Sequence, residues 1–235
     1  MTVDDLKMQY GDEYPAAVVV DGIRIPLFRE SRFMRDFGTH EDKSQGVWIS
    51  RFMDGSASIT APELMVEWPT WTEELRSDFC RSCVWLHEQS DFPDMLRFIM
   101  KHGGRYNRPA VALSVASTLP LDEAFGLLLE ALHTAEIGGA CVNFCQAIAQ
   151  TNHPDAKATL RQHLQAVWAH EKLWNDDPFN NWVAFDATCC IQFLLELGVL
   201  PAEFEEQVRR LSQHVCLRNH DCCRGYLGKH YPWLK

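Results

Sequence analysis

The sequence predicts a mainly α-helical protein, built as an array of paired helices behind a small N-terminal part that contains β-hairpins. Apolar residues recur at helical spacing from Thr72 almost to the C-terminus. Along the same stretch, a proline with an acidic residue close behind it recurs several times. Two Asp-Gly pairs within the first 70 residues favour hairpins instead. The fold class therefore changes along the chain.

Length and composition are those of a globular protein. The chain has 235 residues, of which 46% are hydrophobic, enough to bury a sizeable core. The N-terminal sequence "MTVDDLKMQYGDEY" is acidic and polar, unlike a secretory signal. No apolar run reaches the ~20 residues that span a bilayer. We therefore expect a cytoplasmic protein without a membrane segment, whose nine cysteines are reduced thiols.

The net charge of −10 restricts the class of partner. A general nucleic-acid binder has to neutralise phosphates, which an acidic chain does poorly, so we do not expect nucleic acid as a partner. A basic protein would be attracted by the same charge. The charge favours a protein partner.

The first 70 residues are expected to form a separate N-terminal cap. "AVVVDGIRIPLF" places Asp21-Gly22 between two β-branched runs, and "VWISRFMDGSASIT" repeats the device with Asp54-Gly55. Between them, "SRFMRDFG" has the pattern of a short helix over 31–38. Pro69 then breaks the chain, and Thr70 or Thr72 suits the N-cap of the next helix. The predicted domains are 1–70 and 71–235.

The rest of the chain is divided by its prolines. A proline with an acidic residue one or two positions later suits a first helical turn, where the missing N–H costs nothing and the acid faces the positive end of the helix dipole. These prolines are Pro93, Pro120, Pro154 and Pro201, and Pro232 marks a fifth, shorter unit. The spacing is that of a degenerate helical repeat.

One unit, "GGACVNFCQAIAQTNHPDAKATLRQHLQAV", resembles a HEAT-type repeat. The resemblance is one of pattern and covers about residues 72–235. It implies an α-solenoid of four to five helix pairs, in which the second helix of each pair lines a concave surface that holds a partner. A fold-level resemblance of this kind implies little about the role.

The segment "EKLWNDDPFNNW", residues 171–182, lengthens the interval between Pro154 and Pro201 beyond its neighbours. Insertions between repeats gather on one face of a solenoid, often the binding face. The alternative is an ordinary connection, in which the two tryptophans are buried wedges, and we favour that interpretation of the rings themselves. The expected binding residues, from the insertion and from basic helix positions, are Glu171, Trp174, Asp176, Asp177, Asn180, Asn181, Trp182, Arg161 and Arg209.

Two cysteine–histidine patterns offer metal ligands at helical spacing. They are Cys80, Cys83 and His87, and Cys216, His220 and Cys223. Structural zinc needs four ligands, and neither pattern supplies a fourth nearby. Cysteine is also among the most frequently buried residues. We therefore predict core thiols at both places, and no metal or cofactor.

No catalytic motif is present: the chain lacks H-E-x-x-H, G-x-S-x-G, a phosphate loop and a dinucleotide fingerprint. We accordingly expect a binding module, as an adaptor or an inhibitor or immunity-type protein, rather than an enzyme. The alternative is an enzyme acting on a small substrate or on nucleic acid, since some HEAT-like solenoids are DNA glycosylases that use an aspartate and tryptophans. The resemblance points to Asp186 for that role.

Overall fold

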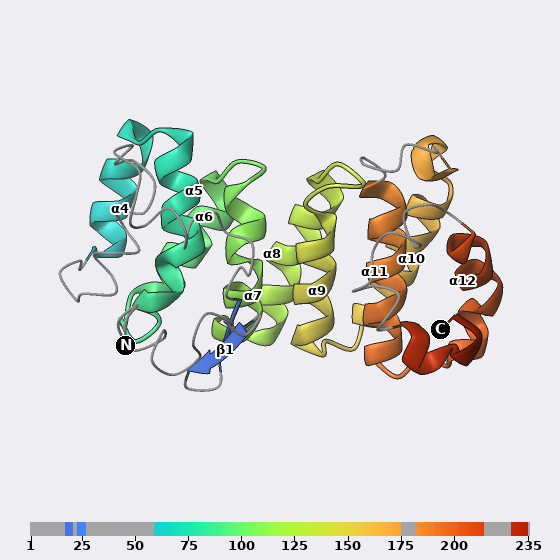
Figure 1. Cartoon of the computed structure of the whole chain (residues 1–235). Coiled ribbons are helices and arrows are strands. Elements are labelled where there is room, and N and C mark those ends of the chain that lie inside the picture. Colours follow the sequence, from blue (N-terminus) through green and yellow to red (C-terminus); the bar gives the residue numbers. More distant parts are fainter. Residues whose placement is uncertain (1–16, 21–22, 27–58, 175–181, 214–226, 235) are drawn as a thin grey trace, which may run out of the picture. The chain divides into compact units, whose positions relative to one another are not determined.

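A computed structural model of the chain describes residues 17–20, 23–26, 59–174, 182–213 and 227–234, and Figure 1 traces them. The chain divides by its internal contacts into two compact units, Met1–Thr118 and Leu119–Lys235. The described residues of both units are mainly helical, with helices packed against one another in a way compatible with a helical repeat. In the described residues, no helix has both the length and the apolar character needed to cross a membrane.

The first unit holds a two-stranded antiparallel sheet and a group of helices. Val20 pairs with Ile23 and Ala17 with Pro26, so Asp21-Gly22 lies between the strands, where the sequence predicts the first hairpin. The second hairpin and the short helix over 31–38 lie outside the described residues. The elements of this unit are β1 (Ala17–Val20), β2 (Ile23–Pro26), α4 (Ala61–Glu67), η1 (Trp68–Thr70), α5 (Glu73–Ser82), η2 (Cys83–Leu86), α6 (Phe92–His102) and α7 (Asn107–Thr118).

Helix α4 begins earlier than the predicted change to helical structure at Thr72. A capping box explains its start: Thr60 Oγ1 accepts the Glu63 N–H, and the Glu63 carboxylate accepts the Thr60 N–H at 2.7 Å. The Asp91 carboxylate accepts the Ala61 N–H at 2.6 Å, which ties α4 to the start of α6. The prediction of a helix start missed this T-x-x-E pattern.

The second unit contains the elements α8 (Leu121–Thr134), α9 (Cys141–Thr151), α10 (Ala156–Trp168), η3 (Glu171–Trp174), α11 (Trp182–Glu196), η4 (Pro201–Phe204), α12 (Glu205–Ser212) and η5 (Pro232–Leu234). Helix α9 packs against α8, α10 and α11, and α10 also packs against α11. Figure 1 shows α9 and α11 side by side. These three helices, α9, α10 and α11, surround the part of the core that carries the polar residues described below.

The predicted prolines lie at helix starts in both units. Pro93 is in the first turn of α6, Pro120 is the N-cap of α8, and Pro201 and Pro232 begin η4 and η5. Pro154 comes two residues ahead of α10. Apolar residues at helical spacing are buried as well; positions without exposed surface include Phe79, Leu96, Leu128, Leu160 and Cys190. The helical spacing of apolar residues therefore agrees with the buried face over most of these helices.

Candidate functional site

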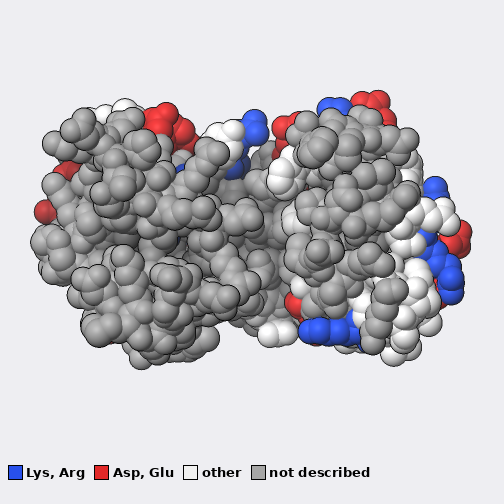
Figure 2. All heavy atoms as spheres, in the orientation of Figure 1, with Lys and Arg blue, Asp and Glu red and all other residues white. Residues whose placement is uncertain are grey.

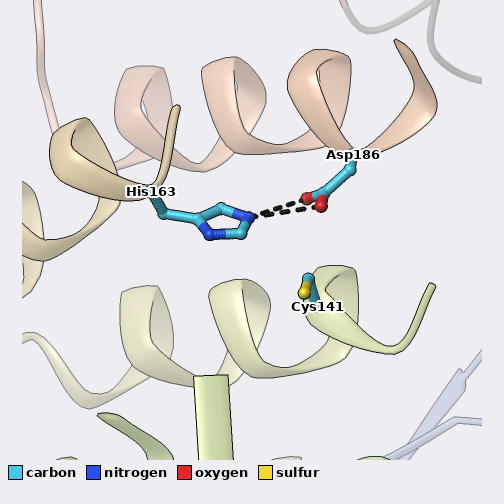
Figure 3. A group of neighbouring side chains, drawn as sticks. All are labelled: Cys141, His163 and Asp186. Carbon is cyan, nitrogen blue, oxygen red and sulfur yellow. Dashed lines mark hydrogen bonds and ion pairs between the residues drawn. The ribbon is translucent and has the colours of Figure 1, made fainter. Parts of the chain in front are cut away.

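Three polar side chains converge in the core of the second unit, one from each of three neighbouring helices. Cys141 is the first residue of α9, His163 belongs to α10 and Asp186 to α11. Cys141 and Asp186 have no exposed surface, and His163 is 9% exposed. Figure 3 shows the three side chains pointing into the space between the helices. We call this group the Cys–His–Asp centre.

The centre is held by specific contacts. His163 Nε2 lies 3.1 Å from Asp186 Oδ1 and 3.2 Å from Oδ2. The Gly138 N–H donates to Asp186 Oδ2 at 3.2 Å, and the Cys141 thiol donates to the Glu136 carbonyl oxygen at 3.2 Å. One ligand atom from each of the three side chains lies within 4.8 Å of the others. A carboxylate is thus buried with its oxygens satisfied, as burial of a charge requires.

The loop ahead of α9 reaches the centre because of a glycine. Gly138 has φ +84°, a left-handed conformation that side chains disfavour. A Cβ there would lie 2.7 Å from Val183 Cγ2 and 2.9 Å from Val183 N, so the loop backbone passes directly against α11. This close approach brings the Gly138 N–H to the Asp186 carboxylate.

A second polar layer lies one helical turn away. Cys145 follows Cys141 by four residues on α9, and Cys190 follows Asp186 by four on α11. The Cys190 thiol donates to the Leu160 carbonyl oxygen of α10 at 3.2 Å, and Cys145 interacts with the Cys190 thiol. The core between the three helices therefore contains two successive layers of sulfur and oxygen groups.

The electrostatics of the centre keep its thiol protonated. Burial, together with the neighbouring Asp186 carboxylate, raises the pKa of Cys141 to about 12. A cysteine nucleophile needs the opposite shift. The imidazole nitrogen that faces the carboxylate is also Nε2, so this nitrogen does not connect Cys141 to a base as in a Cys–His–Asp relay. The centre is better suited to binding a metal than to nucleophilic catalysis.

Sequence reasoning found one member of the centre and missed two. Asp186 is the aspartate of the enzyme alternative, whereas Cys141 and His163 fall within helical patterns that single out neither residue. The available signal was the matching four-residue spacing of Cys141 with Cys145 and of Asp186 with Cys190. His163 has no such signal, because only packing brings α10 against both partner helices.

Of the two cysteine–histidine patterns of the sequence, for which core thiols are predicted, the one within the described residues does not contribute to this centre. In the described part of the chain, three ligand side chains converge at the Cys–His–Asp centre, and the set of Cys80, Cys83 and His87 is not among such groups. The α-helix carrying Cys80 ends at Ser82, and Cys83 begins the 3₁₀ turn η2, so the three residues do not share one α-helical face. Cys80 and Cys83 are buried. Cys216, His220 and Cys223 lie outside the described residues.

A second candidate feature lies on the surface of the same unit, where arginines cover tryptophan rings. The guanidinium carbon of Arg210 lies 4.5 Å from the ring centroid of Trp174 and 5.5 Å from that of Trp168. Arg209 covers Trp233 at 4.4 Å. The two indoles under Arg210 meet edge to face, 5.3 Å apart. We call Trp168, Trp174, Arg209, Arg210 and Trp233 the Trp–Arg surface; Figure 2 shows basic side chains over α12 on this unit.

The tryptophans of the insertion are not buried wedges. Trp174 is 38% exposed and Trp182 is 55% exposed. Trp174 ends η3, and its ring meets Trp168 edge to face under the Arg210 guanidinium. Trp182 begins α11, and its ring lies edge to face against Phe185. Both rings keep exposed surface, so the interpretation of them as buried wedges was wrong.

The other predicted binding residues are placed as follows. Arg161 is engaged within the unit, since its Nε and Nη2 donate to the two carboxylate oxygens of Glu203 at 2.8 and 3.0 Å. Arg209 pairs with Glu205 at 2.7 Å as well as covering Trp233. Glu171 is exposed at the start of η3. Asp176, Asp177, Asn180 and Asn181 lie outside the described residues.

Comparison of the chain with family models, with curated proteins and with solved structures finds no match. Function is therefore argued from the two features themselves.

Proposed function

We propose that the chain is a protein-binding module of the HEAT-like helical-repeat class, and that it holds its partner on the Trp–Arg surface. The observation that carries this proposal is the position of Arg210 over two indole rings, Trp168 and Trp174. The pairing of successive helices that begin at prolines supports the repeat class. The Trp–Arg surface takes the place of the unspecified concave face expected from the resemblance.

The composition of this surface is that of an interface centre. Tryptophan and arginine are the residue types most enriched among those that dominate binding energy. Trp174 and Trp233 each leave 38% of their surface open to a partner. The indoles are held by neighbouring rings and guanidinium groups, so ordering them on binding costs little conformational entropy. A pre-organised aromatic platform of this kind suits recognition.

Arg210 defines the chemistry of the partner. A guanidinium that stacks by its face keeps the N–H donors of its edge available. No acidic side chain among residues 59–174, 182–213 and 227–234 pairs with Arg210, whereas Arg209 is paired with Glu205. We infer that the partner presents a carboxylate to Arg210 and an apolar group to Trp174. The carboxylate provides a charge-assisted hydrogen bond, and the apolar group buries the exposed part of the indole.

The net charge of −10 supports a particular form of this module, an inhibitor or immunity-type protein directed against a basic partner. Long-range attraction and local contact act at different distances, so an acidic chain can steer a basic protein while one arginine binds one of its carboxylates. Added salt would then slow association more than it speeds dissociation.

The position of Asp186 does not support the enzyme alternative. A nucleic-acid enzyme would require the Asp186 carboxylate to reach its substrate. That carboxylate has no exposed surface and accepts hydrogen bonds from His163 and Gly138. We therefore do not extend that alternative.

The proposal is tested by panning a phage-displayed random peptide library on the full chain and on four variants. Arg210→Gln and Trp174→Ala remove the proposed contacts. Arg105→Gln and Tyr106→Ala are matched controls, because Arg105 covers the 59% exposed Tyr106 at 4.8 Å in the first unit. We expect enriched peptides that combine an acidic with an apolar residue.

The affinities of the four variants for the selected peptides test whether Arg210 and Trp174 form the binding surface. We expect affinity for the selected peptides to fall about 10-fold or more in Arg210→Gln and Trp174→Ala, equal to about 1.4 kcal/mol or more. Both first-unit controls should bind as the parent chain does. A library that yields no peptide, or peptides that bind all four variants equally, would overturn the proposal. Affinity capture from the native extract at two salt concentrations, with the same variants, then identifies the partner.

A further inference from the structure

We propose that the Cys–His–Asp centre is a zinc site, with Cys141 Sγ, His163 Nε2 and Asp186 Oδ1 as its protein ligands. The site is separate from the Trp–Arg surface and does not depend on the proposed function. Its three ligands come from α9, α10 and α11, so a bound ion would join the three helices at one point.

The donor set selects the class of metal. Calcium and magnesium prefer oxygen ligands only, whereas thiolate, imidazole and carboxylate together suit zinc. Three protein ligands with a fourth position left for water are typical of zinc sites that are not purely structural. A thiolate and a carboxylate also balance the two charges of the ion. A neutral assembly is what a buried site between helices can accommodate, because net buried charge is costly.

The geometry is close to that of an occupied site. Zinc ligands at bond lengths of about 2.0–2.3 Å in a tetrahedral array lie roughly 3.5 Å from one another. The ligand atoms of Cys141, His163 and Asp186 lie within 4.8 Å of one another, and Nε2 lies 3.1 Å from Oδ1. The largest of these separations exceeds the value for an occupied site by at most about 1.3 Å, which the ligand side chains have to close on binding.

The surroundings also support the ligands. Asp186 Oδ2 accepts the Gly138 N–H, which fixes the carboxylate and leaves Oδ1 directed at His163. Hydrogen-bonded carboxylates of this kind are the usual outer support of metal ligands. The sulfur layer of Cys145 and Cys190 one turn away makes the pocket more polarisable than an aliphatic core.

Proton balance gives the binding step a pH dependence. Zinc binds the thiolate and the neutral imidazole, so the Cys141 proton is released to solvent and the imidazole proton resides on Nδ1. Release of a proton is general for thiolate ligands, so zinc affinity increases as the pH rises.

The test uses the purified full chain, stripped of metal with a chelator and titrated with CoCl₂ and then ZnCl₂. We expect about one equivalent of cobalt to bind with a thiolate-to-cobalt absorption band, which zinc then abolishes. Cys141→Ser and His163→Gln should lose the band and bind at least ~10-fold more weakly, since each removes a ligand but can keep a hydrogen bond. Cys189→Ser is the matched control, because Cys189 is buried on α11 outside the centre.

Thermal unfolding gives a second readout that does not rely on colour. ZnCl₂ should raise the Tm of the parent chain and of Cys189→Ser, but not that of Cys141→Ser. A parent chain that binds no cobalt and shows no zinc-dependent Tm would overturn the proposal and leave a metal-free His163–Asp186 pair. Metal that persists in Cys141→Ser, and is lost in the double variant Cys216→Ser and Cys223→Ser, would also overturn it and place the ion elsewhere.

Discussion

His163 Nε2 lies 3.1 Å from Asp186 Oδ1, inside the second unit and between helices α10 and α11. The same carboxylate accepts the N–H of Gly138, from the loop that leads into α9. One buried side chain thus joins three segments that are distant in sequence.

Asp186→Asn is expected to lower the free energy of unfolding of the metal-free chain by about 1–3 kcal/mol. The carboxamide offers one acceptor oxygen where the carboxylate offers two, so one of its hydrogen bonds is lost in a place that water does not reach. The urea midpoint measures this. Asp94→Asn is the control, since Asp94 pairs with Arg97 at the surface and should change stability by less than about 0.5 kcal/mol. Equal midpoints for the two variants would contradict a structural role for Asp186.

Gly138→Ala is expected to be clearly more destabilising than Gly198→Ala. Both glycines have positive φ, +84° and +82°, so both variants carry the conformational cost of about 1–2 kcal/mol. An added Cβ at Gly198 has no atom within 4 Å, whereas at Gly138 it lies 2.7 Å from Val183 Cγ2. Overlap adds about 1–3 kcal/mol at Gly138. Thermal or urea unfolding of the two variants separates the cost of the Val183 overlap from the cost of the backbone conformation, because only Gly138→Ala carries both. An equal loss of stability in the two variants would rule out the tight contact with Val183.

The described cysteines should resist alkylation in the native chain. Burial raises the pKa of Cys83 and of Cys141 to about 12, so at pH 8 only about one thiol in 10⁴ is a thiolate. Peptide mass spectrometry after brief iodoacetamide treatment should find these two residues unmodified, and fully modified in urea. If Cys141 in the native chain were alkylated as fast as the thiol of free glutathione, the burial of Cys141 would be contradicted.

The Arg161–Glu203 pair should contribute a pH-dependent part of the stability. Hydrogen bonds from the guanidinium lower the pKa of Glu203 in the folded chain. A carboxylate with a depressed folded-state pKa stabilises the fold above its unfolded value, and that stabilisation is lost as the pH falls through the folded-state pKa. The difference in Tm between the parent chain and Glu203→Gln should therefore be largest at neutral pH and disappear in acid. If the difference in Tm did not vary with pH, the Arg161–Glu203 pair would make no pH-dependent contribution to stability.

Local sequence patterns predicted the helical class and most helix starts. Pro120, Pro201 and Pro232 stand at helix starts because proline's fixed φ and missing N–H suit that position wherever it occurs. The T-x-x-E pattern at Thr60 is an equally local signal, and it would have predicted the start of α4. The boundary expected near residue 70 stays a prediction, since it falls within the first compact unit and depends on residues outside those described.

Hydrophobic periodicity predicts most of the buried helix positions, because it reports the geometry of one helix at a time. The meeting of Cys141, His163 and Asp186, and the place of Trp174 beneath Arg210, follow instead from tertiary packing. Both features join side chains from different helices, and their proximity depends on how those helices pack. Packing is set by the summed contacts of whole surfaces, which no local spacing encodes.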